Sequence, residues 1–118
     1  MNLYPVSSHT GTPGILAGLG EIAAGYDALL CDVWGVVHDG RSAHARAVDA
    51  LQRFRARRGP VILLSNAPRP AADVQEQFAH LRIPSDCYDS ILTSGMLARE
   101  DLERRTSGRT LRMLHIGP

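Results

Sequence analysis

Short apolar runs alternate with amphipathic segments along most of this chain, and the alternation limits the fold more than any other feature. The apolar runs have the length and composition of buried strands, and the segments between them repeat apolar residues at helical spacing. Short connections join them, which is typical of an α/β fold with a parallel, Rossmann-like sheet flanked by helices. The expected strands are 28–33, 61–66, 89–94 and 110–117, and the expected helices are 45–59, 70–83 and 95–106.

A further helix is expected ahead of the first strand. The dipeptide Thr12-Pro13 is typical of a helix start, with proline at the first helical position, and residues 14–26 would follow it. Apolar residues share one face of this helix: Leu16, Leu19, Ile22 and Ala23. Several glycines in the same segment weaken the pattern.

Composition limits the partners of the chain. It has 118 residues, 44% of them apolar, which is enough for one modest core. The net charge of +1 comes from scattered arginines without a long basic run, so neither nucleic acid nor a membrane surface is expected as a partner. Cys31 and Cys87 lie far apart without metal-ligand spacing, which fits a reducing cytoplasm. No secretory signal or membrane span is visible, and the oligomeric state stays open.

Polar residues follow the expected strands where a ligand would bind. In open parallel sheets, ligands bind beyond the carboxyl ends of the strands. Asp32 ends the first expected strand, Ser65-Asn66 the second and Thr93-Ser94-Gly95 the third. Alone, each is ordinary cap or turn chemistry. Their joint occurrence after successive strands favours a site.

These residue types together indicate phosphoryl chemistry with a metal. A carboxylate beside a hydroxyl and turn amides binds an anion only when a cation lies between them, and a hard ion such as Mg²⁺ suits oxygen ligands. Asp32 can then attack phosphorus and form an aspartyl phosphate that water hydrolyses. Ser65 and the amides around Trp34, Gly35 and Asn66 would hold the phosphoryl oxygens.

Two stretches resemble known motifs. "LLCDVWGVVHDG" followed by "VILLSNAPRP" resembles motifs one and two of the haloacid dehalogenase (HAD) superfamily, in particular its NagD-like subclass IIA with a large α/β cap. "YDSILTSGMLAREDL" and "LHIG" are similar to the segments that follow, so the resemblance covers residues 29–117. It implies a Rossmann-like core, Mg²⁺, phosphoryl transfer through Asp32, phosphate binding by Ser65, and metal ligation by Asp32 and the Trp34 carbonyl.

Motif one departs from the usual family pattern. The family has Asp-x-Asp there, with the second aspartate as acid and base, whereas this chain has Trp34. An indole transfers no proton at neutral pH, and loss of general acid catalysis costs about two to four powers of ten in rate. Aryl or acyl phosphates, which have good leaving groups, would suffer least. His38 or Asp39 is a candidate replacement acid, and a plain turn is the alternative for this His-Asp pair.

Two later motifs are missing. The third motif of the family is a lysine, and this chain contains none; no acidic pair sits where the fourth would complete the metal site. Residues 1–118 are therefore expected to be the N-terminal part of a HAD-like core domain, without the cap or motifs three and four. On its own this part would be inactive or weak.

Two functions from different classes follow. The first is a Mg²⁺-dependent phosphatase acting on a small phosphorylated metabolite, such as a sugar or nucleotide phosphate. The alternative is a catalytically impaired module that binds a phosphate ligand or regulates. A receiver-like domain is disfavoured because its additional acidic residues and its lysine are absent. Phosphate release that depends on Asp32 separates the first two.

Overall fold

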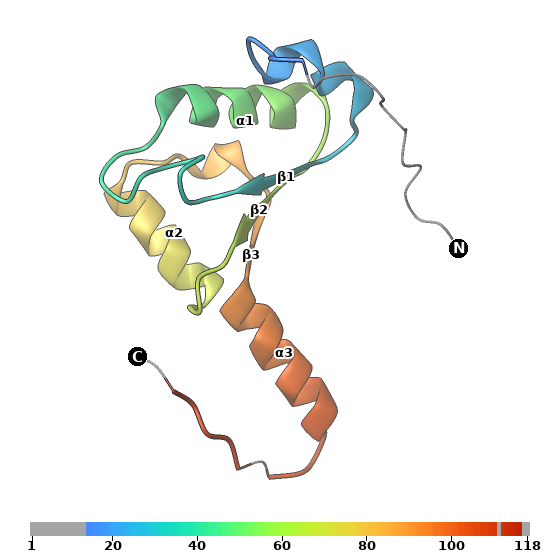
Figure 1. Cartoon of the computed structure of the whole chain (residues 1–118), viewed down its shortest axis with the longest axis vertical. Helices are drawn as coiled ribbons and strands as arrows, with labels where there is room; N and C mark the ends of the chain where they lie inside the picture. The colour runs from blue at the N-terminus through green and yellow to red at the C-terminus, as the bar shows by residue number, and fades with distance from the viewer. Residues whose placement is uncertain (1–13, 111, 117–118) are drawn as a thin grey trace.

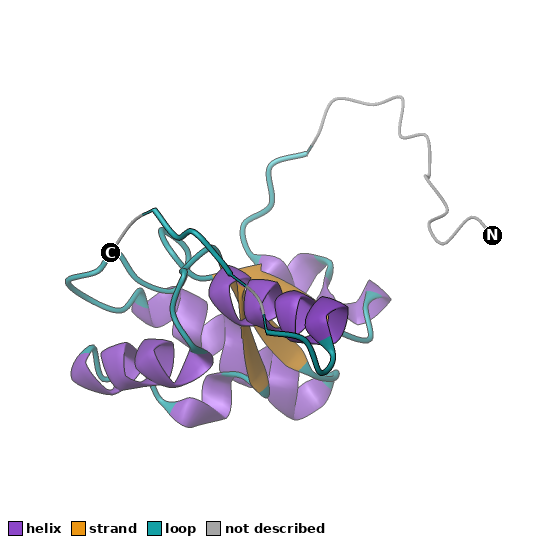
Figure 2. Cartoon of the chain, turned by 90° about the horizontal axis from the view of Figure 1, so that it is seen from below, coloured by secondary structure: helices purple, strands orange, loops and turns teal. Residues whose placement is uncertain are grey.

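The computed structural model describes residues 14–110 and 112–116. Three strands, β1 (Leu29–Asp32), β2 (Val61–Ser65) and β3 (Ser90–Thr93), form one parallel sheet in the order β1-β2-β3. Helices α1 (Ala45–Arg57) and α2 (Ala71–His80) connect the strands, and α3 (Ser94–Thr106) follows β3 (Figure 1). Figure 2 shows the strands running side by side. The predicted Rossmann-like α/β fold is confirmed.

One hydrophobic core joins the sheet to α1 and α2. The apolar residues of α1 recur at helical spacing and are buried, as are those of α2, since each helix turns one stripe toward the strands. Burying each such side chain contributes roughly 1.5–3 kcal/mol. The principal members of this core are Val48, Leu51, Phe54, Val61, Leu63, Val74, Phe78 and Ile91.

The opposite face of the sheet is open within the described residues. Leu30 is 63% exposed and Leu64 is 38% exposed, although parallel sheets are usually covered on both faces. Helix α3 buries no residue and leads the chain away from the sheet (Figure 1). No helix in the described part of the chain is long and apolar enough to cross a membrane.

The expected N-terminal helix is wrong for the residues that the structure describes. Two short 3-10 turns, η1 (Leu19–Glu21) and η2 (Ala23–Gly25), occupy this segment instead. Four glycines between positions 14 and 25 raise the entropic cost of a continuous α-helix, and single turns are what remains. Thr12 and Pro13, the expected start, lie outside the described residues.

The expected fourth strand is also wrong for positions 110 and 112–116, where the structure has no strand. Met113, Leu114 and Ile116 are exposed. A strand exists only through hydrogen bonds to a neighbour, and α3 carries this segment away from the sheet (Figure 1). Positions 111 and 117 lie outside the described residues.

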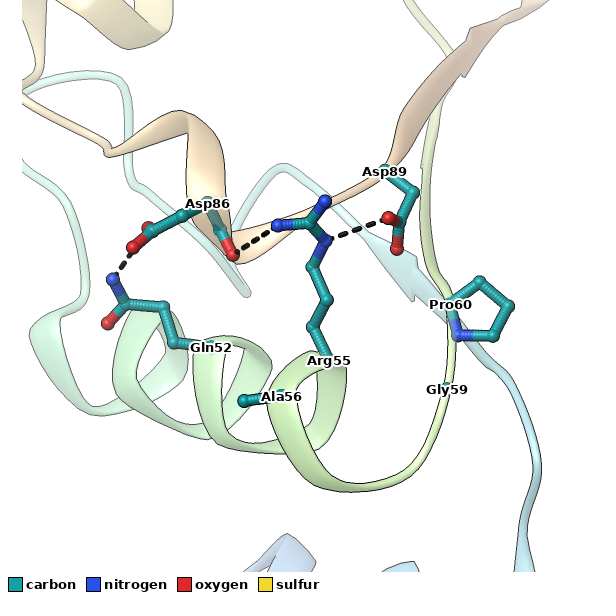
Figure 3. A pocket seen from close by; sticks show the side chains of 7 residues that line it. All are labelled: Gln52, Arg55, Ala56, Gly59, Pro60, Asp86 and Asp89. Atoms are coloured by element: carbon teal, nitrogen blue, oxygen red, sulfur yellow. Dashed lines mark hydrogen bonds and ion pairs between the residues drawn. The ribbon is translucent and has the colours of Figure 1, made fainter.

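One ion pair and neighbouring hydrogen bonds link α1 to the amino-terminal end of the sheet (Figure 3). Arg55 of α1 contacts Asp89 at 2.8 Å, and the second carboxylate oxygen of Asp89 accepts a 2.8 Å hydrogen bond from the Val61 amide. Arg55 also donates to the carbonyl of Asp86 in η3 (Ser85–Cys87), at 3.2 Å. Asp89 therefore ties α1 to the start of β2.

Asp89→Asn is expected to lower the melting temperature at pH 7. The Val61 amide and then Arg55 hold the pKa of Asp89 below its ordinary value, so the carboxylate stabilises the fold above that range. The contribution is lost as pH falls through the lowered pKa, and the two proteins should then melt alike. Thermal melts across this pH range measure the difference. Asp49→Asn is the control, because it removes an exposed helical ion pair that contributes little; an equal loss from both variants would contradict the prediction.

Candidate active site

A pocket of about 430 Å³ lies at the carboxyl ends of the three strands. The parallel register of the strands places these residues side by side, because Asp32 lies opposite Leu64 and Ser65 lies opposite Thr93. The structure thus places Asp32, Ser65 and Asn66 in one pocket, at the ends of the first two strands, where the sequence predicts them. The lining residues are Asp32, Leu64, Ser65, Asn66, Leu92, Thr93, Ser94 and Leu97.

Asp32 is the one acidic side chain among these lining residues. It is exposed, and it shares the open face of the sheet with its register neighbours Leu64 and Leu92. One carboxylate oxygen accepts a 2.7 Å hydrogen bond from the Val33 amide, which fixes the orientation of the side chain. An accessible, oriented carboxylate is what a nucleophile at this position requires.

Ser65 is nearly buried, and its position is fixed by the loop that follows β2. Its Oγ accepts a 3.2 Å hydrogen bond from the Ala67 amide. Because a hydroxyl can accept and donate at once, this bond leaves its proton free to donate. Asn66, the next residue, is exposed at the same edge.

Thr93 joins the loop after β2 to the start of α3. The fully buried side chain donates to the Arg69 carbonyl at 2.7 Å and accepts from the Met96 amide at 3.1 Å, as the N-cap of α3. Gly95 adds a second link, because its amide donates to the Ala67 carbonyl at 3.1 Å. The loop after β2 and the start of α3 form two walls of the pocket. Hydrogen bonds to backbone groups therefore hold these two walls together.

The backbone polar groups of the turn after Asp32 form hydrogen bonds to one another within the turn. Gly35 has φ +77°, and its amide donates to the His38 carbonyl at 2.8 Å. The amides of Val36 and Val37 both bond to the Val33 carbonyl. Gly35 was expected to hold phosphate, yet it does not line the pocket and its amide is engaged within the turn.

His38 and Asp39, the two candidate replacement acids, also lie outside the pocket lining. His38 is fully buried, which lowers its pKa, and its Nδ1 accepts a 2.9 Å hydrogen bond from the Gly40 amide. Asp39 accepts from the amides of Ser42 and Arg41, and these bonds lower its pKa. Both side chains build the turn, which favours the plain-turn interpretation of this His-Asp pair.

Trp34 packs onto its own loop and does not line the pocket of Asp32. Its indole lies against Gly40 and meets the imidazole of His38 edge to face, with ring centroids 5.2 Å apart. These contacts make the indole part of the packing within the loop.

The residues present offer part of a Mg²⁺ site. Asp32 and the Trp34 carbonyl are hard oxygen donors, and Mg²⁺ in proteins often binds through one or two carboxylates together with water and phosphate oxygens. Among the described residues, no three His, Cys, Asp or Glu side chains cluster to hold a metal. The donor type fits Mg²⁺, and the set is incomplete within the described residues.

Apolar residues complete the pocket, and sequence reasoning missed them. Leu64 and Leu92 come from the strands, and Leu97 comes from the first turn of α3. The signal was available for the strand residues, because each stands next to the last residue of its strand. Leu97 had no such signal, since its place depends on the direction in which α3 leaves the sheet.

Fold and site together define an α/β protein whose strand ends carry an accessible carboxylate beside a hydroxyl. Comparison with known families shows to which family this α/β protein belongs. Residues 29–117 match the haloacid dehalogenase-like hydrolase family, to which the chain therefore belongs.

A solved structure and the curated proteins were also compared. The crystal structure of a hydrolase of the haloacid dehalogenase-like family from Brucella suis 1330 is similar, with 42% sequence identity and a TM-score of 0.68. The similarity covers 75% of this chain and 33% of that one, so this chain spans about a third of the length of that protein. Among the curated proteins there is no match.

Proposed function

We propose that the protein containing this chain is a Mg²⁺-dependent phosphatase of the NagD-like branch, acting on a small phosphorylated metabolite. One observation carries the proposal: the exposed Asp32 carboxylate shares a pocket with the Ser65 hydroxyl at the carboxyl ends of neighbouring parallel strands. Membership of the haloacid dehalogenase-like hydrolase family supports it.

Residues 1–118 are the N-terminal part of the catalytic core in this proposal. The lysine and the acidic pair that complete the site, and the cap that selects the substrate, belong to other parts of the protein. The absence of lysine from this chain and its coverage of only 33% of the Brucella suis protein support this division. Two free cysteines, Cys31 and Cys87, are consistent with a cytoplasmic location.

The chemistry proceeds through Asp32. A carboxylate oxygen of Asp32 attacks phosphorus, the bond to the leaving oxygen breaks, and an aspartyl phosphate forms. Ser65 donates a hydrogen bond to a phosphoryl oxygen, and water then releases phosphate and restores the carboxylate. When bound to Asp32 and the Trp34 carbonyl, Mg²⁺ would neutralise charge on the phosphoryl group.

Leaving-group protonation is the weak step in this site. Trp34 cannot supply a proton, and His38 and Asp39 are engaged in the turn. The leaving oxygen must therefore depart as an anion or take its proton from water. Phosphate esters of acidic alcohols are the favoured substrates.

Phosphate release is expected to require Mg²⁺ and to favour an aryl ester. 4-Nitrophenyl phosphate should turn over at least about a hundredfold faster than glycerol phosphate, the lower limit of what a missing general acid costs. Phosphate release is measured from this chain and from the longer protein, with Mg²⁺ and then with EDTA. Equal rates for the two esters would show that an acid acts in the site, and unchanged rates in EDTA would exclude the metal.

The alternative function is a module that binds a phosphate ligand without turnover. Trp34 at the acid position and the Gly35 amide engaged with His38 favour it. In that case phosphate binds in the presence of Mg²⁺ while no ester is hydrolysed by either form of the protein.

A further inference from the structure

The peptide group between Trp34 and Gly35 has a fixed orientation. Its N–H donates to the His38 carbonyl at 2.8 Å, and Gly35 adopts φ +77°, which glycine allows without strain. The described residues contain no cis peptide bond, so the carbonyl of this group, which belongs to Trp34, points opposite to the N–H. The bond to His38 therefore sets the direction of the Trp34 carbonyl.

The main chain of His38 is anchored by its own side chain. The imidazole is fully buried, and it meets the rings of Trp34 and Phe78 edge to face, with centroids 5.2 and 5.8 Å apart. Its Nδ1 accepts a 2.9 Å hydrogen bond from the Gly40 amide. Contacts with α2 and with its own loop thus fix the ring, and the His38 carbonyl is fixed with it.

Histidine at this position has a cost. Because Nδ1 accepts, the neutral ring carries its proton on Nε2, and this buried N–H has no hydrogen-bond partner among the described residues. A buried donor without a partner destabilises the folded state. Phenylalanine would fill similar space without that cost, but it could not accept the bond from Gly40. What histidine adds is therefore an acceptor that fixes the loop.

We propose that His38 is a positioning residue of the Mg²⁺ site: through the bond from Gly35, it fixes the direction of the Trp34 carbonyl, a metal ligand in the proposed function. This inference rests on the proposed function and gives a role to a residue outside the pocket. A side chain cannot turn its own backbone carbonyl, so the hydrogen bond on the same peptide group orients it. Removing a group that orients a metal ligand typically lowers metal affinity by about 10–100-fold.

Binding of Mg²⁺ to the longer protein, measured by calorimetry without substrate, tests this role. His38→Phe keeps an aromatic ring and removes the acceptor, so the affinity for Mg²⁺ should fall at least about tenfold. His38→Asn is the conservative variant, because its side-chain oxygen can accept the bond from the Gly40 amide in place of Nδ1. It should bind Mg²⁺ nearly as tightly as the original protein.

A second variant and a control separate orientation from stability. A Cβ at Gly35 meets nothing within 4 Å, but alanine is strained at φ +77°, so Gly35→Ala should turn the peptide group and weaken Mg²⁺ binding without disturbing the core. Val74 is buried in the core of α2, outside this loop. Val74→Ala should lower the melting temperature and leave Mg²⁺ affinity unchanged. Circular dichroism checks that each variant folds.

The outcomes distinguish this inference from the proposed function. Unchanged Mg²⁺ affinity in His38→Phe, or in Gly35→Ala if the first variant does not fold, overturns the positioning role and leaves the phosphatase untouched. A loss that His38→Asn does not reverse, or that Val74→Ala shares, also overturns it. A loss specific to the loop variants supports the role, and if the original protein then releases no phosphate, the phosphatase alone is removed. An original protein that binds no Mg²⁺ overturns both.

Discussion

Asp32→Asn is expected to abolish phosphate release, lowering the rate by roughly four powers of ten or more. An amide oxygen is not a nucleophile toward phosphorus, and it is a poorer ligand for Mg²⁺ than a carboxylate. Both losses act on the same step, so they do not add as independent effects. The measurement is phosphate release from 4-nitrophenyl phosphate by the longer protein and its variant.

The same substitution should leave stability nearly unchanged. Asp32 is exposed, and its hydrogen bond from the Val33 amide can be accepted equally by the asparagine carbonyl. Surface changes of this kind usually fall within about 0.5 kcal/mol. Asp27→Asn is the matched control, because Asp27 is an exposed carboxylate just before the same strand and lies outside the pocket. Full activity in Asp32→Asn would remove the aspartyl phosphate from the mechanism.

The sheet could be predicted because its signals are local. Val61 to Ser65 form a continuous apolar run closed by a polar residue, and α1 repeats its apolar residues at helical spacing before the Gly59-Pro60 stop. Residues 110–117 carry a strand signal of the same kind and form no strand where they are described. Strand propensity shows that a segment is able to pair with another strand. Whether a neighbouring strand is within hydrogen-bonding distance depends on other parts of the chain.

The candidate site also contains some features that the sequence predicts and others that it does not. Asp32, Ser65 and Asn66 could be placed from the sequence because parallel strands end at one edge of the sheet. The engagement of the Gly35 amide and the burial of His38 could not. Each depends on contacts across a turn or between the turn and α2, and no spacing in the sequence records them.

Gly95→Ala is expected to destabilise the protein by about 3 kcal/mol, although alanine is the better helix former. Gly95 lies in the first turn of α3, where propensity alone predicts a gain. A Cβ there would fall 2.1 Å from the Pro68 carbonyl oxygen and 2.4 Å from its carbon. These are backbone atoms, so a rotamer change cannot relieve the contact.

The substitution should also impair the site, because the contact joins the two walls of the pocket. Relief requires the loop after β2 to separate from α3, which strains the bonds from Gly95 to Ala67 and from Thr93 to Arg69. Ser65 lies at the base of that loop. Denaturant unfolding gives the stability change, and Gly20→Ala is the control, since a Cβ at Gly20 meets nothing within 4 Å. A rise in stability for Gly95→Ala would mean that helix propensity outweighs this contact, and that the two walls are free to move apart.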